Sequence, residues 1–247
     1  MPKTYKEKHI VKCYEVDPRK NFKAFSFMNA AQEMGHIHST MMGEGYGDLI
    51  KSGNIWVISR AHVVFIDPPT WEQVTWMETW HRCQDGVFSI RDFEMTSEKG
   101  EKLIEATTSW VIMNMETRKL QRPDHVISPK ALSLINPDRI TIPEYCSKIR
   151  APKGLELVQH HEVRISDIDY NLHSNNAKYL EWTMDCIDPE IIKETTIDEF
   201  RINFNTESTL GEIIDMYRVR TGENEFYLEG RNGNRNIFQI IIKFKSK

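Results

Sequence analysis

The fold is decided by the stretch Ala24-Phe-Ser-Phe-Met-Asn-Ala-Ala-Gln-Glu-Met-Gly-His-Ile-His-Ser-Thr-Met-Met42. Its apolar side chains recur at spacings of three and four residues, at Phe25, Met28, Ala31, Met34, Ile37 and Met41. Such spacing is typical of a helix with one apolar face. We therefore expect one long helix that is buried on one side and ends at the glycines that follow, Gly43, Gly45 and Gly47.

Segments that favour β-strands surround this helix. They are rich in Val, Ile, Trp and Thr and are separated by turn sequences. In the first half of the chain, strands are expected at residues 9–14, 55–66, 74–83, 87–97 and 102–115. A sheet with one wet face must bury the other, so this order suits a sheet curled around one buried helix. That is the hotdog arrangement.

The second half of the chain repeats the order. A strand is expected at 155–165, a helix from near Ser174, and further strands at 198–205, 212–221, 225–231 and 236–245. Two such copies can pair side by side into one continuous sheet, which removes exposed edges at the junction. We therefore predict an α+β fold, a tandem double hotdog. Its copies are expected at residues 1–122 and 151–247, joined by a linker at 123–150 with a short helix near 128–134.

Composition sets limits on function. Among the 247 residues, 40% are hydrophobic and 28% are charged, which is typical of a soluble globular protein. The longest apolar runs have the length of strands, so no membrane span is expected. The charged N-terminus lacks the apolar core of a secretion signal, which makes the cytoplasm the expected location. A net charge of −4 gives no support for nucleic-acid binding.

Cysteine and histidine spacing gives no metal site. Cys13, Cys83, Cys146 and Cys186 lie far apart without a CxxC pair, so we expect reduced thiols and neither a zinc site nor a disulfide framework. His36 and His38 lie near Glu33 but point to different faces of a helix. We expect them to be surface or partly buried histidines. No metal site is expected at these residues.

The stretch from Arg164 to Trp182 carries the chemistry. It places two aspartates, three asparagines and one histidine just before the second predicted helix. Asp169, Asn171 and His173 alternate, so in an extended segment their side chains share one face. Such a set can hold and deprotonate a water, while N–H groups at the helix start stabilise an oxyanion. The alternative is that Asp169 and Asn171 only close a turn and that Asn175 caps the helix.

The sequence resembles the fatty acyl-acyl carrier protein thioesterases, the plastid enzymes of plants and their bacterial relatives, over nearly its whole length. Asp169-Tyr-Asn-Leu-His173 resembles the aspartate-x-asparagine-x-histidine signature of the family, and Asn175-Asn-Ala-Lys-Tyr-Leu-Glu-Trp182 resembles the helix that follows it. In the first copy, similar segments occur in the order of the family at Ile55–Arg60, Glu78–Trp80, Arg91-Asp92 and Ser109–Arg118.

The resemblance implies hydrolysis of the thioester between a fatty acyl chain and the phosphopantetheine arm of acyl carrier protein, without metal or dissociable cofactor. Asp169, Asn171 and His173 fall on the catalytic signature. Where the plant enzymes have Glu-Cys, this chain has Asn203 and Phe204, so no cysteine nucleophile is available there. We interpret Asn203 as a water-orienting amide. The attacking group is expected to be water; a covalent anhydride through Asp169 is less favoured.

The acyl pocket is expected mainly in the first copy. This copy has Ala24–Asn29 where we expect the signature, so it is interpreted as non-catalytic. In the family the first copy shapes the acyl pocket, which favours Met34 and Trp56 as lining residues, although the methionines of the helix are equally suited to a plain core. Arg91 is a weaker candidate, with a surface salt bridge as the alternative. Asn175 is a further candidate for binding substrate.

Two other functions stay open. A hotdog thioesterase acting on acyl-coenzyme A would use the same phosphopantetheine arm and the same reacting bond. A non-enzymatic hotdog that binds acyl thioesters is less consistent with an intact Asp-x-Asn-x-His set. The expected partner is an acyl carrier protein bearing a fatty acyl chain, and a homodimer is a candidate assembly.

Overall fold

The computed structural model describes residues 2–145 and 147–246, so Cys146 lies outside the described residues. The main elements of the first half are β1 (Thr4–Ile10), α1 (Ala24–Met41), β2 (Asn54–Phe65), β3 (Val74–Asp85), β4 (Phe88–Ser97) and β5 (Lys102–Asn114). Those of the second half are β7 (Glu156–Glu162), α5 (Lys178–Asp185), β8 (Thr195–Phe204), β9 (Ile213–Gly222), β10 (Glu225–Asn232) and β11 (Arg235–Ser246). Each half is therefore a strand, a helix and four further strands, as predicted.

Short elements complete the chain. They are the 3-10 helices Cys13–Glu15, Ile50–Ser52 and Ile165–Asp167, strand β6 (Leu120–Gln121), and helices α2 (Tyr46–Leu49), α3 (Pro123–Val126), α4 (Pro129–Leu132) and α6 (Pro189–Glu194). Helix α4 confirms the short helix expected in the linker. It begins at Ser128, whose hydroxyl accepts a hydrogen bond from the N–H of Ala131 at 3.2 Å.

In the described residues, the strands form one antiparallel sheet of eleven strands. Its main path is β1-β3-β4-β5-β2-β8-β11-β10-β9-β7, so the second half repeats the first in mirrored order. The halves join where β2 pairs with β8, from Arg60 opposite Asn203 to Val64 opposite Glu199. The predicted continuous sheet is thus confirmed.

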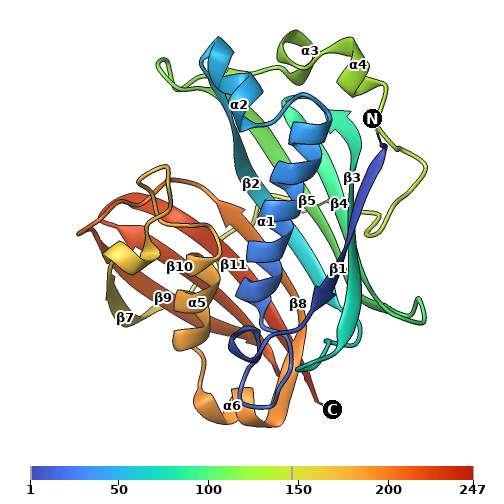
Figure 1. Ribbon diagram of the computed structural model, residues 1–247. Coiled ribbons are helices and arrows are strands. Elements are labelled where there is room, and N and C mark those ends of the chain that lie inside the picture. The colour runs from blue at the N-terminus through green and yellow to red at the C-terminus, as the bar shows by residue number, and fades with distance from the viewer. Residues whose placement is uncertain (1, 146, 247) are drawn as a thin grey trace.

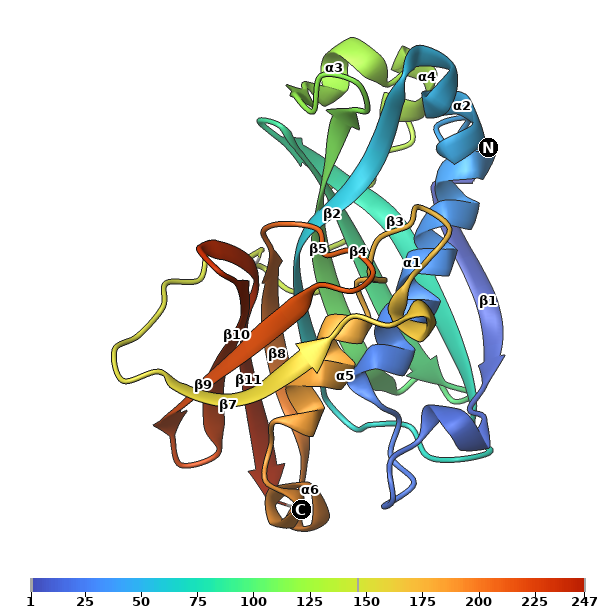
Figure 2. The same ribbon diagram turned by 90° about the vertical axis from the view of Figure 1, so that its left-hand side faces the viewer.

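Helices α1 and α5 lie side by side and cover one face of this curved sheet (Figures 1 and 2). Their buried side chains meet those of the strands in one apolar core, to which α1 contributes Phe27, Met28 and Met34 and α5 contributes Leu180 and Trp182. The apolar face predicted from spacing is therefore the face that α1 buries.

Two predicted boundaries differ most from the structure. The first strand spans Thr4–Ile10 rather than 9–14, because the Glu15 carboxylate accepts the N–H of Lys12 at 2.7 Å and closes a 3-10 turn there. The second helix begins at Lys178 rather than near Ser174. Ser174 forms a bridge with Ile168 instead, so this part of the backbone pairs as extended chain and cannot be helical.

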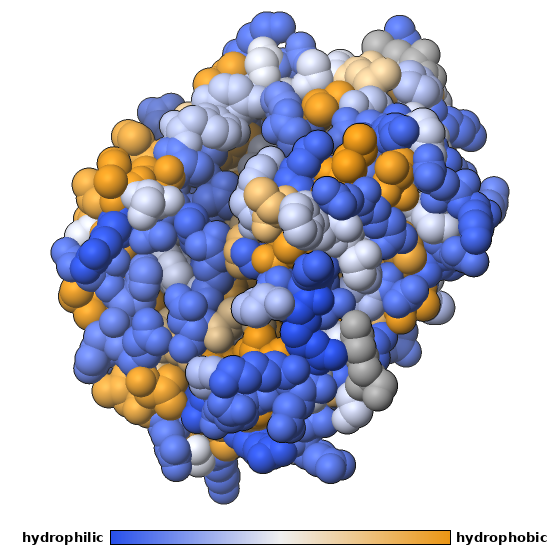
Figure 3. All heavy atoms as spheres, turned by 60° about the horizontal axis from the view of Figure 1, so that its bottom comes forward, coloured by the Kyte–Doolittle hydropathy of each residue, from blue (hydrophilic) through white to orange (hydrophobic). Residues whose placement is uncertain are grey.

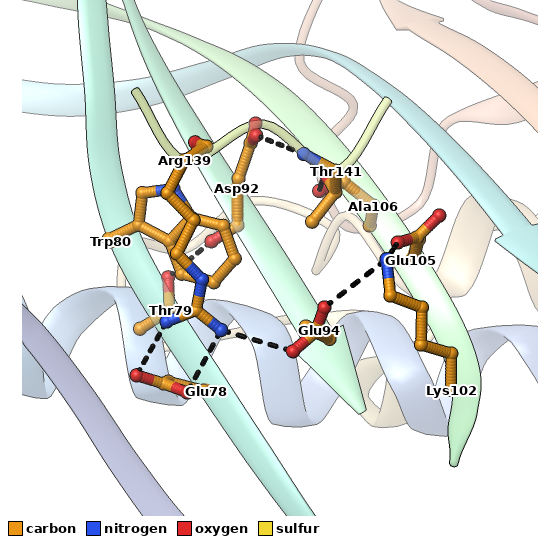
Figure 4. Close-up of polar contacts among 10 residues, drawn as sticks. All are labelled: Glu78, Thr79, Trp80, Asp92, Glu94, Lys102, Glu105, Ala106, Arg139 and Thr141. Carbon is orange, nitrogen blue, oxygen red and sulfur yellow. Dashed lines mark hydrogen bonds and ion pairs between the residues drawn. The ribbon is translucent and has the colours of Figure 1, made fainter. Parts of the chain in front are cut away.

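The linker is fastened to the outer face of the first copy's sheet. Figure 4 shows the Arg139 guanidinium stacked on Trp80, 3.8 Å from the ring centroid, with Glu78 at 2.8 Å and Glu94 at 3.0 Å. Nearby, the N–H of Thr141 donates to Asp92 at 3.0 Å. The cation–π contact with Trp80 and the two ion pairs of Arg139 together hold the linker against the sheet.

No helix in the described part of the chain has the length and apolar character needed to cross a bilayer. The face at the bottom of Figure 1 carries mainly hydrophilic residues, among which apolar residues form separate groups (Figure 3).

One core position tests the packing directly. A Cβ atom at Gly230 would lie 2.5 Å from Phe238 Cε1 and 2.9 Å from Ile214 Cγ2. Because the core is close-packed, we expect Gly230→Ala to lower the free energy of unfolding by about 1–3 kcal/mol, as measured by urea denaturation. Gly47→Ala is the control, since nothing lies within 4 Å of its Cβ position. Equal stability of the two variants would contradict the packing argument.

Candidate active site

A cavity of about 1270 Å³ lies between the two copies. The first copy contributes one stripe of α1, which includes Gln32, Gly35 and Ser39, and parts of β2, β4 and β5. The second copy contributes the loops at 169–176 and 204–209. Neither copy alone therefore forms this cavity.

The Asp-x-Asn-x-His segment is a tight turn at the cavity wall. The N–H of Asp169 donates to the carbonyl oxygen of His173 at 2.9 Å, and the N–H of Leu172 donates to that of Asp169 at 3.0 Å. Leu172 has a positive φ of 64°. The expectation of an extended segment with three alternating side chains was therefore wrong.

All three residues of the signature still line the cavity. Because Ile168 bridges Ser174, Asp169 and His173 stand opposite each other on antiparallel backbone, where side chains share one side. Both line the cavity. Asn171 lies at the exposed tip, where its N–H donates to Asp169 Oδ1 at 2.8 Å. Asp169 thus closes the turn, as the alternative interpretation predicted, and also faces the cavity.

Asn175 connects this turn to both helices. Its Oδ1 accepts the N–H of Ala177 at 2.9 Å, just before α5 begins, and the Nε2 of Gln32 on α1 at 3.4 Å. Asn175 therefore closes a turn just before α5, whose N-cap is Ala177 without a side-chain cap, so the expected capping by Asn175 was wrong. Asn175 also lines the cavity, so the start of α5 lies beside it.

Glu207 was missed by the sequence analysis. Its Oε2 lies 3.4 Å from Nε2 of His173 and 2.5 Å from a guanidinium nitrogen of Arg118 in the first copy. The plant pattern pointed only to positions 203 and 204, whereas Glu207 reaches the cavity through the path of the loop after β8. A carboxylate therefore lies beside His173, and its ion pair with Arg118 connects it to the first copy.

Asn203 does not lie with these residues. Its Oδ1 accepts the N–H of Ile149 at 2.8 Å and its Nδ2 donates to the carbonyl oxygen of Ser147 at 3.2 Å, so its amide holds the linker. Successive side chains of a strand point to opposite faces. Phe204 accordingly lines the cavity, whereas Asn203 faces away from it.

The first copy contains the same turn. The N–H of Asp17 donates to the carbonyl oxygen of Asn21 at 2.9 Å, and Asp17 Oδ1 accepts the N–H of Arg19 at 2.8 Å. Lys20 has a positive φ of 68°, like its counterpart Leu172. The turn is therefore a feature of the fold, and the second copy differs by having His173 at the place of Asn21.

This finding corrects the expected counterpart, Ala24–Asn29, which lies within α1. The first copy's turn borders a small cavity of about 180 Å³, next to Thr195 at the start of β8. Arg19 reaches across and donates to the carbonyl oxygen of Thr195 at 2.8 Å. The cavity beside the first copy's turn is thus small, and Arg19 already spans from this turn to β8.

Family models match both halves of the chain. The model described as "Acyl-ACP thioesterase N-terminal domain" matches residues 2–129, and "Acyl-ACP thioesterase C-terminal domain" matches residues 151–246. This chain belongs to the acyl-ACP thioesterase family. The resemblance found in the motifs is confirmed.

Individual relatives agree with this assignment. The chain is 30% identical to the chloroplastic oleoyl-acyl carrier protein thioesterase 2 of Arabidopsis thaliana, in an alignment that covers 94% of this chain and 67% of that protein. An acyl-ACP thioesterase from Bacteroides thetaiotaomicron has a similar fold, with a TM-score of 0.87, 22% identity and 98% of each chain covered. The 12:0-ACP thioesterase from Umbellularia californica also gives a TM-score of 0.87, at 23% identity, with 100% of this chain and 99% of that chain covered.

In this acyl-ACP thioesterase, the described cysteine thiols lie away from the turn at Asp169–His173. Cys13, Cys83 and Cys186 do not line the cavity. Burial raises the pKa of the Cys83 thiol and raises that of Cys186 to about 11, so both stay protonated near neutral pH. A thiolate nucleophile from these residues is not supported. Cys146 lies outside the described residues.

The three pocket candidates of the first copy differ in position. Met34 is completely buried in the core and does not line the cavity, so its side chain packs as plain core. Trp56 lines the cavity and donates from Nε1 to the carbonyl oxygen of Glu44 at 2.9 Å. Arg91 also lines the cavity but is only 7% exposed, so it is not a surface salt bridge.

Two buried histidines lie near Arg91. His38, expected at the surface or partly buried, is completely buried, and its Nδ1 lies 2.9 Å from Arg91. Burial, with the charge of Arg91 as a second cause, lowers the pKa of His38 to about 4, and the same causes lower that of His81 to about 3. Both imidazoles are therefore neutral at physiological pH.

This burial predicts a pH-dependent stability. Between pH 6.5 and about 4, His38 binds a proton only when the chain is unfolded, so the free energy of unfolding falls as the pH falls through this window. Each such site contributes at most about 1.4 kcal/mol per pH unit. Urea denaturation at pH 7, 6 and 5 should show a smaller loss for His38→Asn than for wild type, with His81 accounting for part of what remains. Parallel losses would contradict the assignment.

Proposed function

We propose that this protein hydrolyses the thioester of fatty acyl-acyl carrier protein and releases the free fatty acid, which ends chain elongation. The observation that carries the proposal is the placement of Asp169 and His173 opposite each other on the wall of a cavity shared by both copies. Membership of the acyl-ACP thioesterase family supports the reaction type. Acyl carrier protein as partner and the cytoplasm as location belong to the same proposal.

In the proposed mechanism a water molecule attacks the thioester carbonyl carbon. Asp169 and His173 hold this water, and His173, with the Glu207 carboxylate beside it, accepts its proton and returns a proton to the leaving thiolate. The N-terminal end of α5 borders the cavity, and the positive end of its dipole favours the negative charge of the tetrahedral intermediate. Asn171 completes the set from the exposed tip of the turn.

The acyl chain is proposed to bind in the part of the cavity formed by the first copy. Apolar side chains gather there, among them Trp56, Val111, Met113 and Ile127. The sheet order and the two central helices support a double hotdog with copies at 1–122 and 151–247. In this proposal the first copy shapes the pocket and the second copy carries the chemistry.

The test is release of thiol by the purified protein from matched acyl-acyl carrier protein and acyl-coenzyme A substrates of several chain lengths. We expect kcat/KM to be at least about tenfold higher with acyl carrier protein, because a protein partner adds contacts that coenzyme A lacks. Hydrolysis of neither substrate would exclude the proposed activity. A preference for coenzyme A would instead identify an acyl-coenzyme A thioesterase.

Glu207 is expected to contribute less to kcat than His173 does. In Glu207→Gln, His173 loses the negative charge that stabilises its protonated form, so we expect kcat to fall about tenfold with little change in KM, a loss of about 1.4 kcal/mol. The control is Glu190→Gln, which removes an exposed carboxylate on α6 that pairs with Lys193. If both variants keep wild-type kcat, Glu207 has no role in the reaction.

A further inference from the structure

The tip of the turn that carries His173 is apolar and faces solvent. Tyr170 and Leu172 are each 74% exposed. Tyr170 packs edge-on against Tyr46 of α2, with 5.7 Å between the ring centroids, but this contact leaves most of its surface uncovered. Large apolar side chains that gather at one exposed place usually mark a surface that another molecule covers.

Leu172 is unfavourable for the folded chain in two ways. Its φ of 64° lies in the left-handed region, which a bulky apolar residue rarely adopts, and its exposed side chain gains little from burial. The first copy has Lys20 at the same place, with a φ of 68° and the same hydrogen bond, from its N–H to the carbonyl oxygen of Asp17 at 2.9 Å. A polar residue thus suffices for the turn, and the fold alone does not account for the leucine.

A second exposed leucine lies in the loop before β9. Leu210 is 58% exposed, and its counterpart in the first copy is Trp71. The residues that follow these two, Gly211 and Glu72, both have a positive φ, of 82° and 68°. Each also donates its N–H to the valine just after the first strand of its own copy, at 2.9 and 3.0 Å. The two loops therefore correspond residue by residue.

In the first copy the two equivalent positions contact each other. Lys20 Nζ lies over the Trp71 ring, 5.5 Å from its centroid, so an ammonium group covers the ring and keeps this surface polar. The equivalent residues of the second copy are Leu172 and Leu210, neither of which carries a charge. The second copy thus presents apolar side chains where the first presents a lysine. Tyr170, Leu172 and Leu210 are called the tip patch below.

The substrate decides which molecule meets the tip patch. In the proposed function the acyl thioester is attached to acyl carrier protein by a phosphopantetheine arm, which has about the reach of five extended residues, roughly 17 Å. With the thioester at His173, the surface of the carrier must lie within this distance of the turn. A protein interface covers about 800 Å² on each partner, a patch roughly 30 Å across. This is wide enough to include the residues next to His173.

We propose that the tip patch is a docking surface for acyl carrier protein, in which apolar side chains of the carrier cover Leu172, Leu210 and Tyr170. This inference rests on the proposed hydrolysis of acyl-acyl carrier protein. Coenzyme A has the same arm but no protein at its end. The tip patch therefore contributes to kcat/KM for carrier-bound chains and not for chains on coenzyme A.

The test is Leu172→Asn, assayed with dodecanoyl-acyl carrier protein and dodecanoyl-coenzyme A. Asparagine is polar and is tolerated at a positive φ, so the turn should form with unchanged or higher thermal stability. We expect kcat/KM with the carrier substrate to fall about tenfold, or about 1.4 kcal/mol, mainly through KM. With coenzyme A it should stay within about twofold of wild type. Leu210→Asn should act in the same direction.

The matched control is Lys20→Asn. It introduces the same residue at the same place of the first copy's turn, where φ is also positive. It should leave kcat/KM unchanged for both substrates, because the first copy's turn does not lie beside the thioester. A loss with the carrier substrate in Leu172→Asn alone would therefore report on the tip patch.

Carrier protein that bears the phosphopantetheine arm without an acyl chain measures docking without turnover. In calorimetric titration its Kd should rise about tenfold in Leu172→Asn. A wild type that hydrolyses no thioester, yet binds this carrier more tightly than Leu172→Asn does, would reject the proposed function and keep the docking surface. A wild type that neither hydrolyses nor binds would reject both.

Other results would overturn the docking surface alone. One is unchanged kcat/KM and Kd for the carrier in folded Leu172→Asn and Leu210→Asn. Another is an equal loss with the carrier and with coenzyme A, which would show that the leucine acts on the turn itself. A wild-type dimer in sedimentation that Leu172→Asn dissociates, with carrier binding unchanged, would assign the patch to contact between two copies of this chain.

Discussion

Replacing His173 with asparagine is expected to lower kcat for acyl-acyl carrier protein by about 100-fold or more, because it removes the proposed proton acceptor. The fold should survive the change. Asn21 occupies the same place in the first copy's turn and accepts the same backbone hydrogen bond, at 2.9 Å from the N–H of Asp17. A loss of activity without a loss of thermal stability would therefore report on chemistry rather than on folding.

The control for this variant is His160→Asn. His160 also lies beside a carboxylate, with Nδ1 2.7 Å from Asp215, but on β7 and away from the cavity. It should keep wild-type kcat. Wild-type kcat in a correctly folded His173→Asn variant would remove His173 from the mechanism and leave Asp169 as the only candidate base on the turn.

Much of the fold follows from side-chain spacing. The three- and four-residue spacing in α1 and the strand-forming segments of both halves predicted the repeat and the joined sheet, because burial of one face dominates these elements. The end of the first strand did not follow, since the turn after it depends on a single contact between Glu15 and the backbone of Lys12. Such local contacts leave no periodic signal.

The candidate site was predicted only in part. Asp169 and His173 were identified, but they meet through a turn, and Leu172 in the left-handed region is not an arrangement that alternation suggests. Asn203 was placed at the site because the resemblance aligns it with the glutamate of the plant Glu-Cys pair, but its side chain faces away from the cavity and holds the linker. Glu207 lay beyond sequence reasoning altogether, because its contact with His173 depends on how the loop after β8 crosses the cavity.

The repeated turn also separates two roles of Asp169. In both copies the aspartate Oδ1 accepts a backbone N–H two residues later, at 2.8 Å in each. Asparagine makes the same kind of turn, so it preserves this structural role while removing the negative charge. The charge matters only where a cavity with a histidine lies beside it, which holds for Asp169 and not for Asp17.

We therefore expect Asp169→Asn to lower kcat for acyl-acyl carrier protein by about 100-fold, and Asp17→Asn to leave it unchanged, with similar thermal stability in both variants. The reason is that the carboxylate of Asp169 holds and polarises the attacking water, whereas Asp17 only closes its turn. Thiol release and thermal unfolding of the two variants, measured side by side, decide the matter. Wild-type kcat in Asp169→Asn would show that this aspartate, like its counterpart in the first copy, serves the turn alone.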